Sequence, residues 1–161
     1  MRSGTVTVVN DWGLFGHPLF LQRLDGLIEE VELLAEDDPE GFHHHPHYKL
    51  LEKVEASILE RVPANPAAAE YLQGNTLGKG NGHWRRVKSG LPNRYRLFFQ
   101  FRSDAPKSII YAWLNDEATL RKDGSKTDVY AVFLAKLKRG EIPSSFAELE
   151  RAAAPIPGHA G

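Results

Sequence analysis

The amino-acid sequence predicts an α+β domain in which an N-terminal pair of helices packs on a small antiparallel β-sheet and a C-terminal helix closes the fold. Apolar residues recur at helical spacing over the first 62 residues, at strand-like spacing between residues 84 and 115, and at helical spacing again after residue 128. Helices followed by a run of strands and a last helix are typical of α+β proteins rather than of alternating β-α-β folds.

The first half of the chain is expected to be mainly helical. A β-branched run at Thr5–Val9 predicts a short edge strand. An apolar stripe predicts a helix over residues 18–34, and the acidic residues after it end the helix. A second stripe predicts a helix from His47 to Arg61, which Pro63 is expected to end because proline lacks the amide hydrogen of a continuing helix. The short connection between the two indicates an antiparallel pair.

The second half is expected to begin with strands. Gly74–Gly82 contains four glycines and predicts a loop. A helix at Asp128–Arg139, stopped by Gly140, and a short last helix through Arg151, capped by Ser144 or Ser145, follow the strands. The strands of an antiparallel meander are expected at Trp84–Lys88, Asn93–Arg102 and Lys107–Asn115.

Length and composition limit the class of protein. We expect one domain at residues 1–151 and a flexible tail at residues 152–161, which are rich in Ala, Pro and Gly. The 161 residues contain no cysteine, which excludes disulfide bonds, thiolate metal ligands and cysteine nucleophiles. No apolar run approaches the roughly 18 residues of a membrane span, and no signal-peptide pattern is present. The expectation is a cytoplasmic protein without a membrane partner.

The net charge of −1 conceals an uneven distribution of charge. Acidic residues predominate before residue 83, whereas the stretch from His83 to Arg102 has six cations and no acidic residue. Such a segment can bind a polyanion even in a nearly neutral protein. The six cations are Arg85, Arg86, Lys88, Arg94, Arg96 and Arg102.

Alternation along the strand Asn93–Arg102 divides it into two faces. Because unpaired guanidinium groups are costly to bury, the arginine-bearing face is expected to be solvated or to bind an anion. Guanidinium groups match phosphate oxygens, and neighbouring rings can stack on unpaired bases, so single-stranded RNA is favoured over duplex DNA. An ordinary solvated sheet face remains the alternative. The core face has Tyr95, Leu97, Phe99 and Phe101, and the RNA face has Arg94, Arg96, Phe98, Gln100 and Arg102, with Trp84, Arg86 and Lys88 from the preceding strand.

A long ordered block of this sequence resembles the YhaV toxin family. It contains Trp84-Arg85-Arg86-Val87-Lys88, Asn93-Arg94-Tyr95-Arg96-Leu97-Phe98-Phe99, Trp113-Leu114-Asn115-Asp116-Glu117, Thr119-Leu120-Arg121, Lys126-Thr127-Asp128 and Tyr130. Asn10-Asp11-Trp12-Gly13-Leu14 and His17-Pro18 are similar as well, so the resemblance extends over residues 10–150.

The resemblance implies a RelE/ParE-like fold and a toxin of a type II toxin–antitoxin system. Such a toxin is a metal-independent endoribonuclease that cleaves mRNA, in many cases on the ribosome, without a cofactor. It arrests growth until its antitoxin binds. The implied antitoxin is PrlF-like (AbrB-type), and any contact with DNA is indirect, through that antitoxin.

The resemblance also implies roles for individual residues. Arg96 and Tyr130 are the expected catalytic pair, and Arg121 and Lys126 are expected to add catalytic cations. RNA cleavage needs a base for the 2′-hydroxyl and an acid for the 5′-oxygen, and the sequence leaves these roles open among Tyr130, Lys126, Asp116, Glu117 and Asp128. The expected RNA-binding residues are Arg86, Lys88, Arg94, Phe98, Arg102, Asn115, Asp116, Glu117 and Asp128.

Two other classes of function compete with the nuclease hypothesis. One is a non-catalytic protein of the same fold, either a ParE-like inhibitor or an RNA-binding module. The other is a metal-dependent hydrolase that uses the histidines of His43-His44-His45-Pro46-His47. We expect no metal site there, because adjacent histidines diverge and no cysteine or carboxylate pair completes a standard ligand set.

Overall fold

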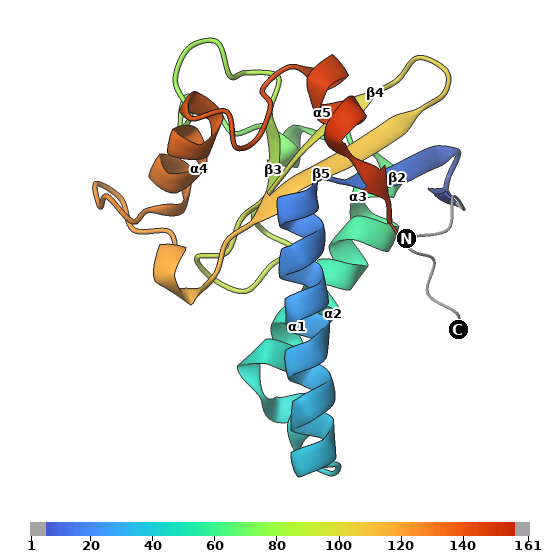
Figure 1. Ribbon diagram of the computed structural model, residues 1–161, viewed down its shortest axis with the longest axis vertical. Helices are drawn as coiled ribbons and strands as arrows, with labels where there is room; N and C mark the ends of the chain where they lie inside the picture. The colour runs from blue at the N-terminus through green and yellow to red at the C-terminus, as the bar shows by residue number, and fades with distance from the viewer. Residues whose placement is uncertain (1–5, 157–161) are drawn as a thin grey trace.

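The computed structural model describes residues 6–156 and has helices on both faces of a central sheet (Figure 1). The sheet has six strands, in the order β1-β2-β5-β4-β3, and β6 pairs with β2 beside β1. The α+β class is confirmed. The strands are β1 (Thr7–Val9), β2 (Trp12–Gly16), β3 (Arg85–Val87), β4 (Leu97–Arg102), β5 (Ser108–Leu114) and β6 (Ala154–Pro155).

The sheet is mixed, so the prediction of a purely antiparallel sheet is wrong. Strands β3, β4 and β5 form the expected antiparallel meander. Strand β2, however, lies parallel to β5, with Leu14 opposite Ile109. A parallel pair needs a long connection, which here contains the helical pair and the first two strands of the meander. The sequence patterns of the individual β-strands predicted the meander. They could not predict the β2–β5 pairing, because it joins segments more than 90 residues apart.

The two helices expected in the N-terminal half are present. Helix α1 (Pro18–Asp37) and helix α2 (Pro46–Ala56) run side by side and extend beyond the sheet (Figure 1). A π-helical turn η2 (Ser57–Arg61) and a short helix α3 (Val62–Ala64) continue α2. The helical run ends at Ala64, one residue after Pro63, which agrees with the expected stop at this proline. Short 3-10 turns are η1 (Phe42–His44), η3 (Ala69–Tyr71) and η4 (Glu117–Thr119).

The C-terminal helices also agree with the sequence. Helix α4 (Val129–Lys138) begins after Asp128, which caps it, and Gly140 follows with a positive φ of 74°. Helix α5 (Phe146–Ala152) is capped by Ser145. The expected loose tail from residue 152 is wrong for its first part, since β6 pairs with β2 and Ile156 is completely buried. Residues 157–161, like Thr5 of the first expected strand, lie outside the described residues.

Both faces of the sheet are covered, so the prediction of an open basic face is wrong. One face packs against α1 and α2 through a core that includes Leu14, Phe20 and Phe99. The other packs against α4 and α5, where Phe98 stacks on Phe133 with ring centroids 4.0 Å apart. Phe98 and Trp84 are both fully buried and unavailable to stack on bases. The apolar stripe of α4 needed a surface to pack on, and this face supplies it.

Strand β4 starts later than its sequence pattern predicts. Arg94 has a positive φ of 74°, a left-handed conformation that ends any extended run, and the strand begins at Leu97. A register shift between Phe98 and Phe99 further disturbs the alternation. Arg94 and Arg96 therefore precede the strand instead of sharing a face with Arg102.

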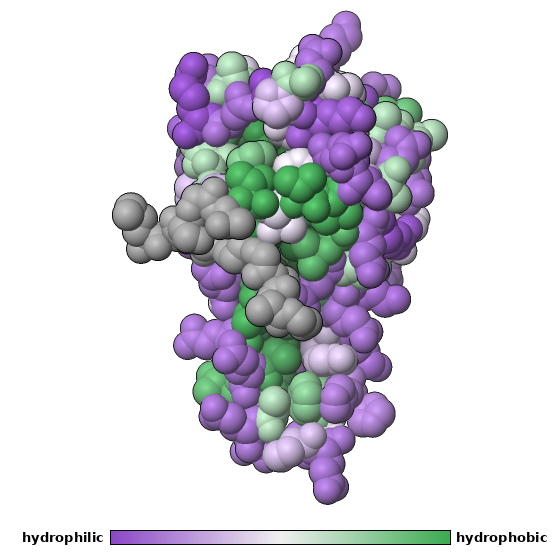
Figure 2. All heavy atoms as spheres, turned by 90° about the vertical axis from the view of Figure 1, so that its right-hand side faces the viewer, coloured by the Kyte–Doolittle hydropathy of each residue, from purple (hydrophilic) through white to green (hydrophobic). Residues whose placement is uncertain are grey.

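An apolar hollow of about 570 Å³ lies at the β1 end of the sheet. Val6, Val8, Phe15 and Pro106 contribute to it, and Val8 is 61% exposed. Figure 2 shows apolar side chains gathered on this side of the molecule. The hollow is next to Ser108, whereas Arg96 precedes the opposite end of β4. Within residues 6–156, every helix is too short or too polar to span a lipid bilayer.

Candidate active site and nucleic-acid interface

A tyrosine held by two arginines is the centre of the candidate site. The hydroxyl oxygen of Tyr130 accepts a hydrogen bond from Nε of Arg86 at 3.1 Å and another from Nε of Arg96 at 3.2 Å. Tyr130 lies in the first turn of α4 and is 5% exposed. The three residues come from β3, from the start of β4 and from α4, so the fold of the second half of the chain brings them together.

A third arginine lies on the ring of this tyrosine. The guanidinium carbon of Arg121 is 4.9 Å from the centroid of the Tyr130 ring, a cation–π distance. Arg121 also forms ion pairs with Asp128 at 2.9 Å and with Asp123 at 3.7 Å. Its charge is therefore partly balanced by carboxylates, unlike the charges of the other two arginines.

Asp128 holds this part of the site in place. Its Oδ2 accepts from the backbone N–H of Tyr130 at 3.1 Å and caps α4. Its Oδ1 accepts from the backbone N–H of Lys122 at 2.6 Å and pairs with Arg121. One buried carboxylate thus fixes both the tyrosine-bearing turn and the arginine that covers the ring.

Arg96 is buried to 7% exposure but is not neutralised. Its Nη1 donates to the backbone oxygen of Tyr95 at 2.8 Å, and Nη1 of Arg86 donates to the backbone oxygen of Glu70 at 2.7 Å. Among residues 6–156, neither Arg86 nor Arg96 forms an ion pair with a carboxylate. The arginines that do so are Arg61, Arg102, Arg121 and Arg139. Two uncompensated positive charges therefore meet at the Tyr130 hydroxyl.

Asn115 ties the segments that carry Arg96 and Arg121 to each other. Its side-chain oxygen accepts from the backbone N–H of Arg96 at 2.8 Å, and its Nδ2 donates to the backbone oxygens of Arg94 and Thr119. The backbone N–H of Arg121 donates to the same oxygen of Arg94. Asn115 is completely buried, so its expected direct contact with RNA is wrong and its place in the molecule is structural.

A pocket of about 410 Å³ opens beside the tyrosine. Tyr130, Arg121 and Asp128 line it together with Thr76 and Ser125. The volume lies within the roughly 300–1,000 Å³ of small-molecule sites. Thr76 belongs to the glycine-rich loop and was not predicted from the sequence, because its approach to α4 depends on the path of that loop.

Two expected RNA-binding cations, Lys88 and Arg94, and one expected catalytic cation, Lys126, are exposed. Lys88 follows the end of β3, Arg94 lies before β4, and Lys126 lies in the connection that leads to α4. None of the three side chains has a hydrogen-bond or ion-pair partner within the described part of the chain. They are free to meet an anion.

Two expected RNA contacts are not part of this cluster. Phe98 is buried between the sheet and α4, so its proposed stacking role is wrong. Arg102 lies at the far end of β4, forms an ion pair with Glu150 at 2.9 Å, and covers the ring of Phe146. Arg102 is six residues from Arg96 along the chain. Its charge is paired with Glu150 of α5 and is not available to bind an anion.

The acidic candidates for a general base make structural contacts. Asp116 caps η4 in a reciprocal arrangement with Thr119. Glu117 accepts from Nε2 of His47 at 3.0 Å. With Asp128 occupied as described above, each of these carboxylates already has partners inside the protein.

The histidines also have structural partners. Nδ1 of His45 accepts from the backbone N–H of His47 and caps α2. His47 lies between Glu30 at 3.2 Å and Glu117. Among residues 6–156, no three or more His, Asp or Glu side chains are grouped so that they could hold a metal ion.

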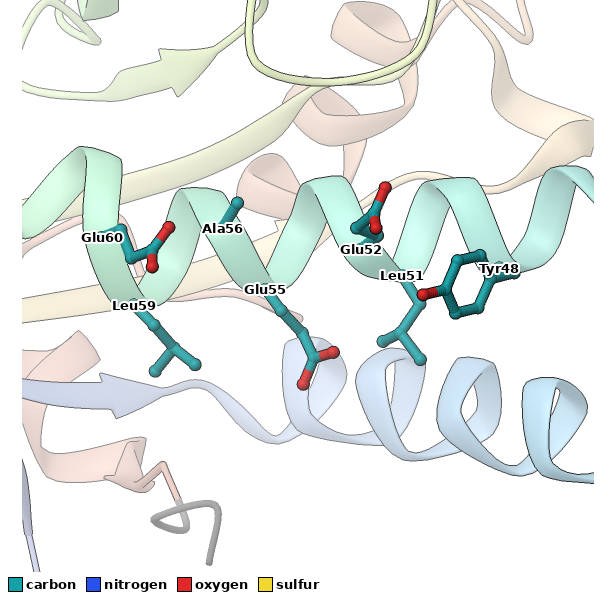
Figure 3. Close-up of a pocket in the computed structure, with 7 residues that line it drawn as sticks. All are labelled: Tyr48, Leu51, Glu52, Glu55, Ala56, Leu59 and Glu60. Atoms are coloured by element: carbon teal, nitrogen blue, oxygen red, sulfur yellow. The ribbon is translucent and has the colours of Figure 1, made fainter. Parts of the chain in front are cut away.

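A groove along α2 is chemically unlike the Tyr130 site. It has a volume of about 350 Å³ and an apolar floor that includes Leu51 and Leu59. Figure 3 shows Glu52, Glu55 and Glu60 around it. Carboxylates of this density repel phosphate, which leaves the end of the sheet near Tyr130 as the candidate nucleic-acid interface.

Comparison with known families assigns the chain. The model of the YhaV toxin family, described as a toxin with endonuclease activity, of a toxin–antitoxin system, matches residues 14–154. The chain belongs to the YhaV toxin family. As a YhaV-family member it is a toxin-system endonuclease, and the matched residues include Arg86, Arg96, Arg121 and Tyr130.

Curated relatives agree with this assignment to the YhaV family. The chain is 45% identical over 144 residues to "Ribonuclease toxin YhaV" of Escherichia coli strain K12, covering 89% of this chain and 92% of the relative. It is 45% identical, over the same shares, to "Toxin YhaV" of Escherichia coli O157:H7, and 45% identical over 142 residues to that of Escherichia coli O6:H1, covering 88% and 91%. No solved structure matches the chain.

Proposed function

We propose that this YhaV-family chain is an endoribonuclease that cleaves mRNA at the cluster of Arg86, Arg96 and Tyr130. The observation that carries the proposal is the Tyr130 hydroxyl, which holds two arginines that have no carboxylate partner. The name "Ribonuclease toxin YhaV" of a relative supports RNA as the substrate.

The chemistry of RNA cleavage suits these residue types. The 2′-oxygen forms a bond to phosphorus and gives its proton to solvent water, while the bond from phosphorus to the 5′-oxygen breaks, and the group that protonates the 5′-oxygen regains its proton from the same solvent. The electron pair leaves with the 5′-oxygen, which takes up a proton, so the products are a 2′,3′-cyclic phosphate and a 5′-hydroxyl. Arginines stabilise the extra negative charge on the phosphorane, by roughly 3 kcal/mol for a well-placed donor.

Tyr130 is the proton carrier in this proposal. Arg86 and Arg96 both donate to its oxygen, so its own O–H is directed elsewhere and can donate to the substrate. Lys126 is exposed next to the pocket-lining Ser125 and supplies a further cation. Asp116, Glu117 and Asp128 are assigned no base role, because their carboxylates already bind neighbouring groups.

Arg121 assists the tyrosine, and Lys88 and Arg94 bind the flanking phosphates. The exposure of the last two residues, and their freedom from internal partners, support this assignment. Because the charge stabilisation comes from arginines, the proposed reaction needs no metal ion.

The resemblance extends the proposal to the fold, the partners and the location of the protein. We assign the domain to the RelE-like folds, its neutralisation to a PrlF-like antitoxin of AbrB type, and its substrate to mRNA, including mRNA on the ribosome. DNA is reached only through the antitoxin. The proposed location is the cytoplasm, where mRNA is present.

A cleavage assay with matched arginine variants tests the proposal. Purified chain is incubated with mRNA and EDTA, and the 5′ ends of the products are mapped. We expect defined cleavage by the wild type, at least a 100-fold loss in Arg96→Ala, and near-normal cleavage in Arg102→Ala, whose arginine binds Glu150 instead.

Two results would contradict the proposal. Full activity of a folded Arg96→Ala variant, or RNA binding by the wild type without cleavage, would favour a non-catalytic toxin. Cleavage that disappears with EDTA and returns with zinc would favour a metal-dependent hydrolase.

A further inference from the structure

A second pocket, of about 350 Å³, lies where the helical pair meets the end of the sheet. Three rings line it, those of His45, His47 and Tyr95, together with Pro46 and Pro92. The rings come from the start of α2 and from the segment before β4, which are about 50 residues apart in sequence. We call this the ring-lined pocket.

The ring-lined pocket shares two wall segments with the Tyr130 site. Tyr95 precedes Arg96, whose Nη1 donates to the backbone oxygen of Tyr95. Glu117, which also lines the pocket, follows Asn115 by two residues, and Asn115 accepts from the backbone N–H of Arg96. An RNA strand bound at the Tyr130 site would therefore lie close to this pocket, at the same end of the sheet.

A cation without an internal partner in the described part of the molecule directly precedes the residues of both sites along the chain. Arg94 directly precedes Tyr95, and hydrogen bonds from Asn115 and from the backbone of Arg121 to its carbonyl oxygen fix its left-handed backbone. Its side chain is exposed and has no polar partner within residues 6–156. Arg94 is thus an exposed cation next in sequence to Tyr95 of the pocket and two residues from Arg96 of the Tyr130 site, where it can bind a phosphate of an RNA strand that reaches both.

Internal contacts hold the walls of the pocket in place. His47 is fixed between Glu30 at 3.2 Å and Glu117 at 3.0 Å, and the His45 ring lies 4.8 Å from that of His47. Preorganised rings lose little conformational freedom when a flat ligand binds. The lining has one carboxylate, of Glu117, and one ammonium group, of Lys49, whose charges offset each other, so a neutral planar group suits the pocket better than an anion.

We propose that the ring-lined pocket binds an unpaired base of the RNA, next to the nucleotide whose phosphate is cleaved. This inference rests on the proposed nuclease function and names a specificity subsite for it. The base stacks on Tyr95, while its phosphate remains outside with Arg94. Stacking of bases on aromatic side chains is the usual way in which proteins hold single-stranded RNA.

Short single-stranded RNAs in which one nucleotide at a time lacks its base provide the test. Dissociation constants and cleavage kinetics are measured for the wild type, Tyr95→Leu, Tyr95→Phe and the control Tyr48→Leu. Tyr48 is a half-buried tyrosine of α2 that lines the acidic groove of Figure 3 instead. Thermal unfolding verifies that each variant is folded.

For the wild type we expect one abasic position near the cleaved bond to raise KM and Kd by roughly 5- to 100-fold. Tyr95→Leu should show the same rise with intact RNA, and little further rise with the abasic RNA, while its kcat stays close to that of the wild type. Tyr95→Phe keeps the ring and should behave as the wild type does. A Tyr95→Leu variant that remains fully sensitive to the abasic position overturns the inference.

The outcomes separate the pocket from the nuclease proposal. A wild type that cleaves RNA while Tyr95→Leu binds and cuts normally refutes the pocket alone. If the wild type never cleaves RNA, but Tyr95→Leu raises the Kd for RNA, the nuclease proposal alone is refuted. If Tyr95→Leu does not fold, the wild type is photocrosslinked to RNA that carries 5-iodouracil. The crosslinks should map to the peptides that contain Tyr95 or His45–His47. Crosslinks found only elsewhere overturn the inference.

Discussion

At the scale of single residues, the candidate site depends on one hydroxyl group. Arg86 approaches the Tyr130 oxygen from β3 and Arg96 from the segment before β4, and Arg121 covers the ring from a third segment. Arginine side chains repel one another, so an acceptor between two of them lowers the cost of bringing them together. The tyrosine is therefore expected both to organise the arginines and to move a proton.

Removing that hydroxyl tests both roles. We expect Tyr130→Phe to lower kcat for mRNA cleavage by roughly 100-fold or more, because general acid–base catalysis contributes about 10²–10⁴-fold. The fold should persist, since the ring still packs against Phe98. Single-turnover cleavage and thermal unfolding measure the two effects. Normal cleavage by the variant would exclude Tyr130 as the proton carrier.

Asp128 offers a separate prediction about stability. Asp128→Ala removes the cap of α4 and the partner of Arg121, and we expect a loss of about 2 kcal/mol in the free energy of unfolding. Asp128→Ser keeps a capping hydroxyl and should lose about half as much, yet both variants release Arg121 and should cleave RNA poorly. Urea unfolding and cleavage assays provide the two readouts. Equal unfolding free energies for Ser and Ala would contradict the capping role.

At the scale of the element, the ends of helices and strands set up the site. Helix α4 starts at the cap that precedes Tyr130, and β4 starts after the left-handed Arg94. Arg86 is the middle residue of β3, whereas Arg96 and Arg121 are carried by irregular segments that flank regular structure. Such segments can present side chains at angles that a continuous strand does not allow.

Helix α1 supplies a pH-dependent prediction. His17 caps it by accepting from the backbone N–H of Leu19, and burial lowers the pKa of His17 below its ordinary value of 6.5. Protonation therefore favours the unfolded chain, so the stabilising contribution is present above pH 6.5 and is lost as the pH falls toward the folded-state pKa. Urea unfolding between pH 8 and pH 5 should show a steeper loss of stability for the wild type than for His17→Asn, which keeps a capping acceptor. Equal slopes would contradict this role of His17.

At the scale of the whole molecule, charge is divided between two parts. Residues 18–61, which form the helical pair and its extension, contain eleven acidic and four basic residues, a net charge of −7. Because the whole chain has a net charge of −1, the remaining residues carry +6. RNA is expected at the basic part, and the acidic helices orient the toxin as it approaches.

This division predicts a measurable dependence on salt. If three phosphates are bound, by residues such as Arg86, Arg94 and Lys126, raising salt from about 50 to 200 mM should weaken RNA binding roughly 20-fold. Arg94→Ala should reduce that factor to roughly 7-fold. Fluorescence anisotropy of labelled single-stranded RNA at several salt concentrations measures both slopes. An affinity independent of salt would contradict phosphate binding at this end of the sheet.

The helices of this protein could be predicted from local sequence patterns. The boundaries of α1, α4 and α5 follow from apolar periodicity and from the caps His17, Asp128 and Ser145, which act within a few residues. The family resemblance named Arg96 and Tyr130 as catalytic residues, although neither spacing nor composition indicates that they touch.

Only the tertiary structure decided which surfaces remain open. The face of Phe98 and Gln100 reads as solvated in the sequence because it alternates with apolar residues, yet α4 and α5 bury it. The contacts of Tyr130 with Arg86 and Arg96 join residues 44 and 34 positions apart, and the ring-lined pocket joins the start of α2 to the segment before β4 and to η4. Local patterns encode local hydrogen bonding, whereas burial and charge pairing depend on how distant segments pack.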